Sequence, residues 1–317
     1  MTLLRRQPPM RRVLLATLPC VAGSVYYFGW RSLAVILVSC LAAFLAEFVF
    51  CRRRKEPVSE AVFVTGILYG LVMPPAVPWH VLIVGIVFAI VFVKEAFGGF
   101  GRNVFNPAVA GRCFVYVCFP AAMTAQWTPV AQGPLGALAQ WTPAGVDTVT
   151  SATPMALMKA GKFIPSAADL FHGMFLGRID GTLGVTSAML ILIGGAYLLF
   201  SRTANRTLVI TVILAYAALT QGLHWLGVEP VPNALPALLG GGFLFGVFFM
   251  VTEPVSAPST RGGRVAYAVL IAVCTVVIRN FSIFNGGLMF AILIGNMFAP
   301  ILDHAAKEWR KPVKAES

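Results

Sequence analysis

Charged residues are scarce in this sequence. They make up 11% of its 317 residues, and only 12 residues are aspartate or glutamate. Apolar residues make up 58% of the chain, and the mean hydropathy is +0.82. A soluble domain carries far more charge on its surface, so this composition excludes one. The sequence therefore predicts an integral membrane protein in contact with lipid.

Clusters of metal-binding residues are also absent from the sequence. The six cysteines lie within apolar segments or at their ends, and no two of them form a Cys-x-x-Cys pair. The four histidines lie near segment ends or in loops. This distribution argues against zinc, iron–sulfur and paired haem sites, and small buried hydrophobes are the better interpretation of the cysteines. We expect no metal site.

Apolar segments long enough to cross about 30 Å of hydrocarbon recur along the chain. Several are short or broken by glycine and proline, and membrane proteins tolerate such breaks where the backbone lines a cavity or is buried in protein. The ten predicted spans are residues 12–29, 32–51, 58–75, 78–96, 107–124, 182–200, 206–226, 235–252, 264–280 and 285–302.

Basic residues lie at the ends of these spans and give a net charge of +12. They form no continuous patch, which argues against binding to nucleic acid. They concentrate in alternate loops, so the positive-inside rule places both termini in the cytoplasm and residues 125–181 on the outer face. No small-residue cleavage site follows the first apolar run, so we interpret it as a retained helix.

The two halves of the chain resemble each other. Three pairs of segments carry the similarity: residues 68–75 and 244–254, residues 81–94 and 267–280, and residues 106–120 and 285–300. Each half holds five spans, an odd number, so the second half enters the membrane in the opposite orientation. The predicted fold is an all-α integral membrane protein of about ten transmembrane helices in two inverted five-helix repeats. Its discontinuous helices break at Met73-Pro74-Pro75 and at Thr252-Glu253-Pro254.

This pattern predicts four parts of the chain. They are the first repeat in residues 1–124, an extracytoplasmic loop in residues 125–181, the second repeat in residues 182–304, and a basic cytoplasmic tail in residues 305–317.

A polar run stands out in the long loop. Residues 147–153 read Asp-Thr-Val-Thr-Ser-Ala-Thr. The run resembles the signal at which a flavin transferase links FMN through its phosphate to the last threonine, here Thr153. Thr153-Pro154 is also a good helix start, because threonine caps helices and proline suits their first turn. The two interpretations are compatible, since a helix N-terminus also favours a phosphate.

Further stretches resemble one protein family. They are Lys94-Glu95-Ala96-Phe97-Gly98-Gly99-Phe100-Gly101-Arg102-Asn103, Phe105-Asn106-Pro107-Ala108, Gly111-Arg112, Thr252-Glu253-Pro254-Val255-Ser256-Ala257 and Asn296-Met297-Phe298-Ala299-Pro300-Ile301-Leu302-Asp303-His304. Together with the Thr153 motif, they are similar to the RnfD/NqrB family, which comprises one membrane protein of the Rnf electron-transport complex and one of the sodium-translocating NADH:quinone oxidoreductase. The likeness runs from about Glu47 onward.

The resemblance implies a function. It implies FMN covalently bound to Thr153, a second, non-covalent flavin, riboflavin, held between helices, and a complex that couples electron transfer to sodium or proton export. The implied partners are other membrane subunits, one with its own FMN, the flavin transferase, and quinone. The chain departs from the family pattern at Ser151, where glycine is usual, and at Glu253, where aspartate is usual. Both changes leave the phosphate acceptor and the carboxylate in place.

The same resemblance implies roles for individual residues. Around the covalent flavin they are Asp147, Thr150, Ser151 and Ala152. For the second flavin they are Gly98, Gly99, Asn103 and Asn106, although a glycine cluster alone is typical of a turn. For quinone they are Phe114 and Tyr116, with core packing as the alternative.

Acidic residues inside spans are rare and usually functional. The resemblance points to Glu47, Glu253 and Asp303 on the cation path. Glu253 is the strongest candidate because it lies in a symmetric helix break. For Glu47 and Asp303 the alternative is a solvated position at the lipid headgroups.

Two questions stay open at this point. The short N-terminus favours the Rnf type, whereas Gly101-Arg102-Asn103 and Gly111-Arg112 favour the quinone-reducing type. A channel or secondary transporter without redox chemistry has the same kind of fold, and there Thr153 is only a helix cap.

Overall fold

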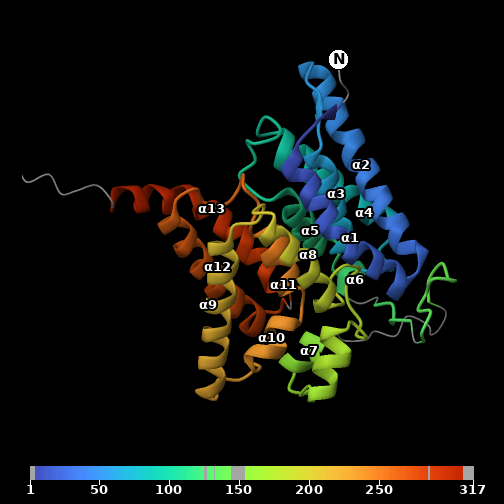
Figure 1. Ribbon diagram of the computed structural model, residues 1–317, viewed down its shortest axis with the longest axis vertical. Helices are drawn as coiled ribbons and strands as arrows, with labels where there is room; N and C mark the ends of the chain where they lie inside the picture. Colours follow the sequence, from blue (N-terminus) through green and yellow to red (C-terminus); the bar gives the residue numbers. More distant parts are fainter. Residues whose placement is uncertain (1–3, 125–126, 132, 144–153, 285, 310–317) are drawn as a thin grey trace, which may run out of the picture.

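The computed structural model describes residues 4–124, 127–131, 133–143, 154–284 and 286–309. Helices make up most of this part of the chain (Figure 1). Its strands are β1 (Leu4–Arg5) and β2 (Val58–Ser59), which pair in parallel. The predicted all-α class is confirmed.

Helices of the first half follow the five predicted spans. They are α1 (Pro8–Phe28), α2 (Trp30–Arg54), α3 (Ala61–Leu71), α4 (Trp79–Phe88) with its π-helical continuation η1 (Ala89–Glu95), α5 (Pro107–Cys118) and α6 (Pro120–Thr124). The connecting loop contributes α7 (Pro154–Lys159) and the π-helical η2 (Asp169–Phe175).

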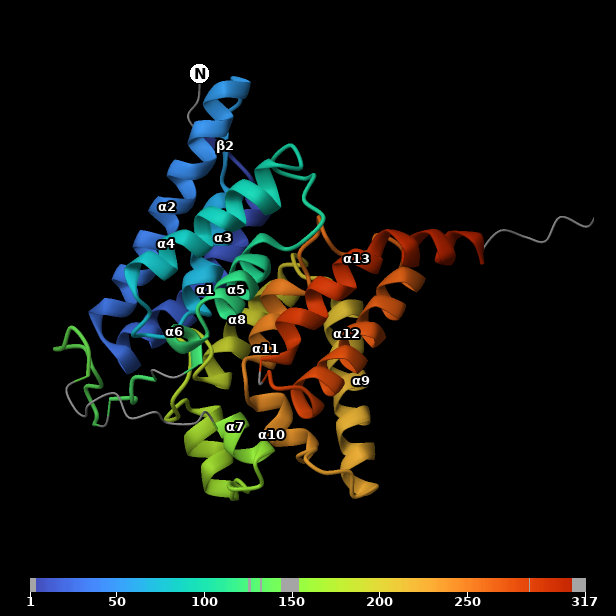
Figure 2. The same ribbon diagram turned by 180° about the vertical axis from the view of Figure 1, so that it is seen from behind.

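The second half is built in a similar way. Its elements are α8 (Ala188–Phe200), α9 (Arg206–Trp225), α10 (Ala234–Leu239), α11 (Phe243–Phe245) with the π-helical η3 (Gly246–Met250), α12 (Arg261–Phe281) and α13 (Gly287–Glu308). In Figures 1 and 2 the blue-to-green helices and the gold-to-red helices form two groups that lie side by side. Both predicted breaks, at residues 73–75 and 252–254, are non-helical.

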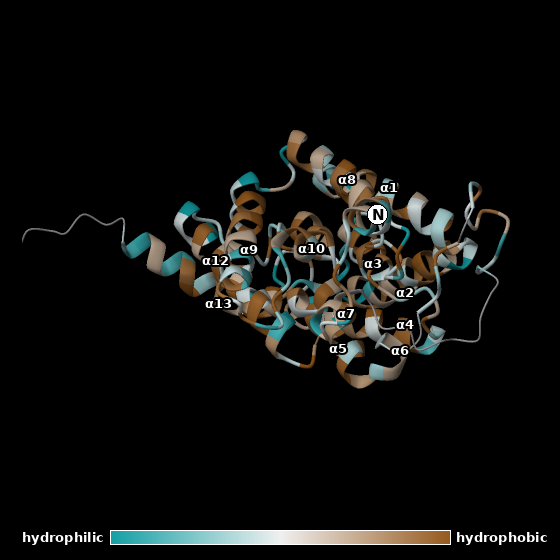
Figure 3. Cartoon of the chain, turned by 90° about the horizontal axis from the view of Figure 1, so that it is seen from below, coloured by the Kyte–Doolittle hydropathy of each residue, from teal (hydrophilic) through white to brown (hydrophobic). Residues whose placement is uncertain are grey.

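Four helices of the described chain are long and apolar enough to cross a membrane. They are α2, α9, α12 and α13. Large apolar side chains also face outward at helical spacing: on α2, Leu37, Leu41 and Leu45 are 52–59% exposed. Figure 3 shows apolar residues, in brown, on the outer side of several helices, including α8. An outward apolar stripe of this kind suits lipid and not water, so the chain is a multi-pass membrane protein.

The break after α3 illustrates how this fold satisfies backbone groups that lack a helical partner. The Leu71 carbonyl accepts a hydrogen bond from the Gly184 N–H at 2.7 Å, and the Met73 carbonyl accepts one from the Leu183 N–H at 3.1 Å. Gly184 is required here, because a Cβ would lie 2.7 Å from the Leu71 Cβ. Residues from the second half of the chain therefore close a break in the first half.

Arg31, at the start of α2, completes the same break. It is half-buried, and its guanidinium donates to the carbonyls of Pro75 at 2.7 Å and of Val77 at 3.0 Å. One side chain thus satisfies two backbone carbonyls of the non-helical segment between α3 and α4.

We expect Arg31→Met to destabilise the protein by about 1–3 kcal/mol, because it leaves the Pro75 and Val77 carbonyls without their donor. The measurement is denaturation of the purified chain in detergent. Arg52→Met, at an exposed position on the same helix, is the control. Equal stability of the two variants would contradict this role for Arg31.

Candidate functional site

A buried network of polar side chains connects the two halves of the molecule. Glu253, in the break after η3, accepts hydrogen bonds from the Asn103 Nδ2 at 3.0 Å and the Ser256 Oγ at 2.9 Å. Asn103 is only 6% exposed and also donates to the Phe105 carbonyl. A break in the second half is therefore held by the loop that precedes α5 in the first.

Asn106 extends this network. Its Oδ1 accepts from the Val109 N–H at 3.2 Å and so caps α5, while its Nδ2 donates to the Met250 carbonyl at 3.2 Å. Pro254 has no N–H to bond the Met250 carbonyl, so Asn106 adds a donor beside the Glu253 N–H, which lies 3.3 Å from the same oxygen. Asn103, Asn106 and Glu253, predicted from separate motifs, lie together.

Asn296 joins three segments at the centre of the network. It is 1% exposed in α13; its Oδ1 accepts from the Asn106 N–H at 3.1 Å, and its Nδ2 donates to the Ser256 carbonyl and the Tyr267 hydroxyl. Asn296 was not among the predicted site residues. The available signal was an amide in the middle of an apolar span, a position where polar groups need partners.

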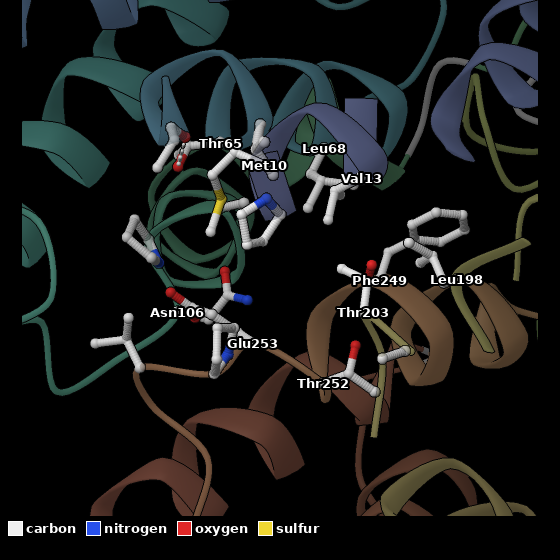
Figure 4. Close-up of a pocket in the computed structure, with 18 of the residues that line it drawn as sticks. Met10, Val13, Thr65, Leu68, Asn106, Leu198, Thr203, Phe249, Thr252 and Glu253 are labelled. Atoms are coloured by element: carbon white, nitrogen blue, oxygen red, sulfur yellow. Dashed lines mark hydrogen bonds between the residues drawn. The ribbon is translucent and has the colours of Figure 1, made fainter. Parts of the chain in front are cut away.

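A cavity of about 330 Å³ adjoins this network. Figure 4 shows Asn106 and Glu253 on one side of it, with Met10, Thr65 and Leu68 facing them. Its other walls include apolar side chains from α8 and η3. The cavity therefore combines an apolar body with a small polar side, which is typical of a small-molecule site.

Lys94, at the end of η1, also lines the cavity and forms a buried ion pair. Its Nζ lies 2.5 Å from a Glu47 oxygen, and the two residues are 2% and 1% exposed. The other Glu47 oxygen accepts from the Ser59 N–H at 3.2 Å. Glu47 is therefore not solvated, whatever its depth relative to the lipid headgroups. Charges this deeply buried persist because they are paired and hydrogen-bonded.

Asp303 has a different setting. It is half-buried, and its two oxygens accept four hydrogen bonds, from the backbone N–H and hydroxyl groups of Ser259 and Thr260, at 2.6–2.9 Å. Asp303 thereby fixes the loop that starts α12. A role on a cation path stays a prediction for this residue.

The two glycines predicted to contact the second flavin lie in a turn after η1. Gly98 and Gly99 have φ values of +104° and +90°, a region that other residues rarely adopt. A Cβ on Gly99 would also meet the Arg54 guanidinium, which pairs with Glu95, at 2.8 Å. Neither glycine lines the cavity. The turn alone thus accounts for both.

The two aromatic residues predicted to contact quinone are packed against other rings. Phe114 stacks on Phe88 with ring centroids 4.0 Å apart, and Tyr116 lies 5.9 Å from Phe284. Both belong to or pack against the hydrophobic core. Core packing, the alternative, describes both positions.

The motif of residues 147–153, with Asp147, Thr150, Ser151, Ala152 and Thr153, lies outside the described residues. The helix that follows is described: α7 begins at Pro154, as the helix-start interpretation predicts. Met155 and Met158 of α7 pack with Met174, and the Lys159 ammonium donates to the Ser282 carbonyl at the end of α12. The residues after the motif are thus anchored to the second half.

Metal ligands do not cluster in the described part of the chain: it contains no group of three or more His, Cys, Asp or Glu residues suited to a metal ion.

Comparison with protein families gives a match over almost the whole chain. Residues 5–310 match the model of the NQR2, RnfD, RnfE family. The chain belongs to this family. The predicted resemblance is confirmed.

Relatives within the NQR2, RnfD, RnfE family come from two kinds of complex. The RnfD protein of the Na(+)-translocating ferredoxin:NAD(+) oxidoreductase complex of Acetobacterium woodii is 34% identical over 94% of this chain and 88% of its own length. The RnfD protein of the ion-translocating oxidoreductase complex of Erwinia tasmaniensis is 33% identical over 93% and 91%. The NqrB protein of the Na(+)-translocating NADH-quinone reductase of Pseudomonas aeruginosa is 37% identical over 90% and 68%.

The Lys94–Glu47 pair gives a test of the site. We expect Lys94→Met to destabilise the protein by about 3–5 kcal/mol, because the Glu47 carboxylate remains buried without its cation. The double variant Glu47→Gln/Lys94→Met removes both charges and should recover most of this loss. Thermal unfolding in detergent is the measurement, and Lys162→Met, at an exposed lysine, is the control. An equal loss in the single and double variants would exclude the unpaired charge as the cause.

Proposed function

We propose that this chain is the flavin-carrying membrane subunit of an ion-translocating electron-transport complex of the Rnf type. Family membership supports the class of complex, because the matched relatives belong to sodium- or ion-translocating oxidoreductases. The observation that carries the flavin part is the cavity beside Asn103, Asn106 and Glu253. The sequence identity of this chain to relatives from the two kinds of complex is nearly equal. Assays of electron transfer must therefore include both ferredoxin and NADH as donors.

The cavity fits the non-covalent flavin, riboflavin. A flavin has a flat, largely apolar ring with one polar edge, and a bound flavin supplies one- and two-electron transfer. The Phe100, Phe248 and Phe249 side chains line the apolar part of the cavity. The Asn103 and Asn106 amides also line the cavity and would orient the polar edge. Gly98 and Gly99 would act only by shaping the preceding turn.

The covalent FMN belongs, in this proposal, on Thr153. Pro154 starts α7 directly after this threonine, and the contacts of the α7 cluster with Leu239 and of Lys159 with Ser282 hold the following residues against the second half. A phosphoester at Thr153 would therefore tether the flavin beside the membrane core. Asp147, Thr150, Ser151 and Ala152 complete the signal that the flavin transferase recognises.

Glu253 is the proposed cation-path residue. It faces the cavity, belongs to a broken helix, and its two bonded partners, Asn103 and Ser256, come from different halves of the chain. A carboxylate held this way exchanges a cation or proton at a fixed position between the two halves. Glu47 and Asp303 are secondary candidates on the same path.

The proposed topology is a ten-helix inverted repeat in a bacterial inner membrane. Both termini lie in the cytoplasm and Thr153 lies on the outer face. The proposed partners are the other subunits of the complex, one of them carrying its own FMN. Quinone contact at Phe114 and Tyr116 is the weakest part of this proposal, because both rings are packed.

The covalent flavin can be tested directly. The membrane-expressed chain, made together with its flavin transferase, is denatured, separated on a gel and examined under ultraviolet light. We expect a fluorescent band that disappears in Thr153→Ala and persists in the control Thr148→Ala, which changes a threonine at a variable position of the signal. Acid extraction of the folded protein should still release riboflavin from Thr153→Ala, because that flavin is not covalently bound.

The outcomes separate the alternatives. A dark wild-type band with no extractable flavin supports the transporter without redox chemistry. A band that stays bright in Thr153→Ala moves the attachment to another residue.

Ion transport tests Glu253. In vesicles containing the complex, Glu253→Gln should reduce the number of cations moved per electron. The glutamine amide is neutral and does not attract a cation as the Glu253 carboxylate does. Fluorescence of the bound flavin should be unchanged. Glu229→Gln, at an exposed glutamate, is the control. Unaltered transport in Glu253→Gln would remove this residue from the path.

A further inference from the structure

A second cavity, of about 540 Å³, adjoins the first and shares five lining residues with it, among them Arg202 and Thr252. We refer to it as the arginine cavity. Its lining includes three arginines and several hydroxyl groups, and none of its lining residues is acidic. They are Arg202, Thr203, Ala204, Asn205, Arg206, Thr207, Leu208, Thr252, Pro254, Ala257, Pro258, Ser259 and Arg264.

Two long helices begin at the arginine cavity. The 20-residue α9 starts at Arg206, where the Asn205 side chain accepts from the Leu208 N–H at 3.2 Å. The 21-residue α12 starts at Arg261, where the Thr260 side chain accepts from the Gly263 N–H at 3.0 Å. The N-terminal turn of a helix carries positive partial charge. The positive ends of both helices therefore add to the arginine charges.

The arginines keep donors available. Arg206 donates through Nε and Nη2 to the Leu199 carbonyl, which leaves Nη1 without a protein acceptor in the described chain. Arg264 donates only through Nε, to the Pro258 carbonyl at 3.0 Å, so both of its Nη groups are likewise unengaged among the described residues. Such guanidinium groups match the oxygens of a phosphate.

Two acids stand next to lining residues of the arginine cavity. Asp303 bonds Ser259 and Thr260, and all four of those hydrogen bonds go to the loop before α12. Glu253 lies between the lining residues Thr252 and Pro254 and accepts hydrogen bonds from Asn103 and Ser256. The three guanidinium groups outnumber these two carboxylates, so the local net charge is positive.

We propose that the arginine cavity binds a phosphate group, and that an anionic phospholipid headgroup supplies it. The side chains Ile210 and Leu214 on α9 and Val265 and Val269 on α12 are 40–63% exposed and follow the basic residues along each helix. They offer an apolar surface for acyl chains next to the charged end. The alternative source of the same chemistry is a soluble phosphate. This inference does not rest on the proposed flavin function.

The experiment uses the full chain in neutral detergent. Native mass spectrometry counts bound phosphatidylglycerol, with zwitterionic phosphatidylcholine as the reference lipid. Thermal unfolding with inorganic phosphate tests the soluble source. The test variant is Arg206→Gln/Arg264→Gln, and the matched control is Arg52→Gln/Arg53→Gln, which removes two exposed arginines outside the cavity.

We expect phosphatidylglycerol to bind at least about tenfold more weakly to the Arg206/Arg264 variant, because several charge-assisted hydrogen bonds are lost. The control variant should bind like the wild type. Stabilisation by inorganic phosphate without retention of phosphatidylglycerol would support the phosphate site and reject the lipid as its source. Unchanged binding in the test variant, or an equal loss in the control, would overturn the proposal.

Two milder variants show whether a loss of binding in the double variant comes from a folding defect. Arg202→Gln changes an exposed side chain and should weaken binding partly. Arg264→Lys keeps the charge but loses the planar fork, so its affinity should fall between those of the wild type and Arg264→Gln. Full affinity in both Arg202→Gln and Arg264→Gln would contradict the site independently of the double variant.

Discussion

The structure depends most on hydrogen bonds to backbone carbonyl groups that have no donor within their own helix. Two helices are interrupted inside an apolar protein, where no water is available to satisfy the exposed groups. The first break is closed by Arg31 and by the backbone of Leu183 and Gly184. The second is closed by the amides of Asn106 and Asn296. In both cases some of the donors come from the other half of the chain, so the breaks hold the halves together.

The candidate site follows from this constraint. Once Asn106 and Asn296 bind the backbone of the second break, Glu253 is brought against Asn103, and the adjacent cavity takes its polar side from the same residues. The ion pair between Lys94 of η1 and Glu47 of α2 lies beside the same cavity, because Lys94 is one of the lining residues. Polar residues are costly in this environment, and Asn103, Asn106, Asn296 and Glu253 each have hydrogen-bond partners. The network therefore provides both cohesion between the halves and the chemistry of the cavity.

Much of this arrangement could be predicted from the sequence. Apolar run lengths predicted the helices, and proline placed both breaks, because proline removes a backbone donor whatever the tertiary context. The motifs identified Asn103, Asn106 and Glu253. The partners were not predictable: Asn296 and Lys94 both stand in stretches that resemble the family, but nothing in those stretches shows that they contact Asn106 and Glu47. Periodicity describes single segments, and it contains no information on which distant segment supplies a donor. Gly98 and Gly99 lie in a turn that requires positive φ values, and their predicted contact with a flavin stays a prediction.

Asn296 also has a consequence for synthesis. It lies on α13, the last helix of the described chain, yet it binds the start of α5 and the second break. During translation the cavity walls from the first half are complete long before Asn296 leaves the ribosome. Until then the backbone groups at Asn106 and Ser256 lack their partner, and the region around Glu253 stays unassembled. A chain interrupted before α13 thus inserts most of its helices without completing the polar network, which ties assembly of the polar side of the cavity to synthesis of α13.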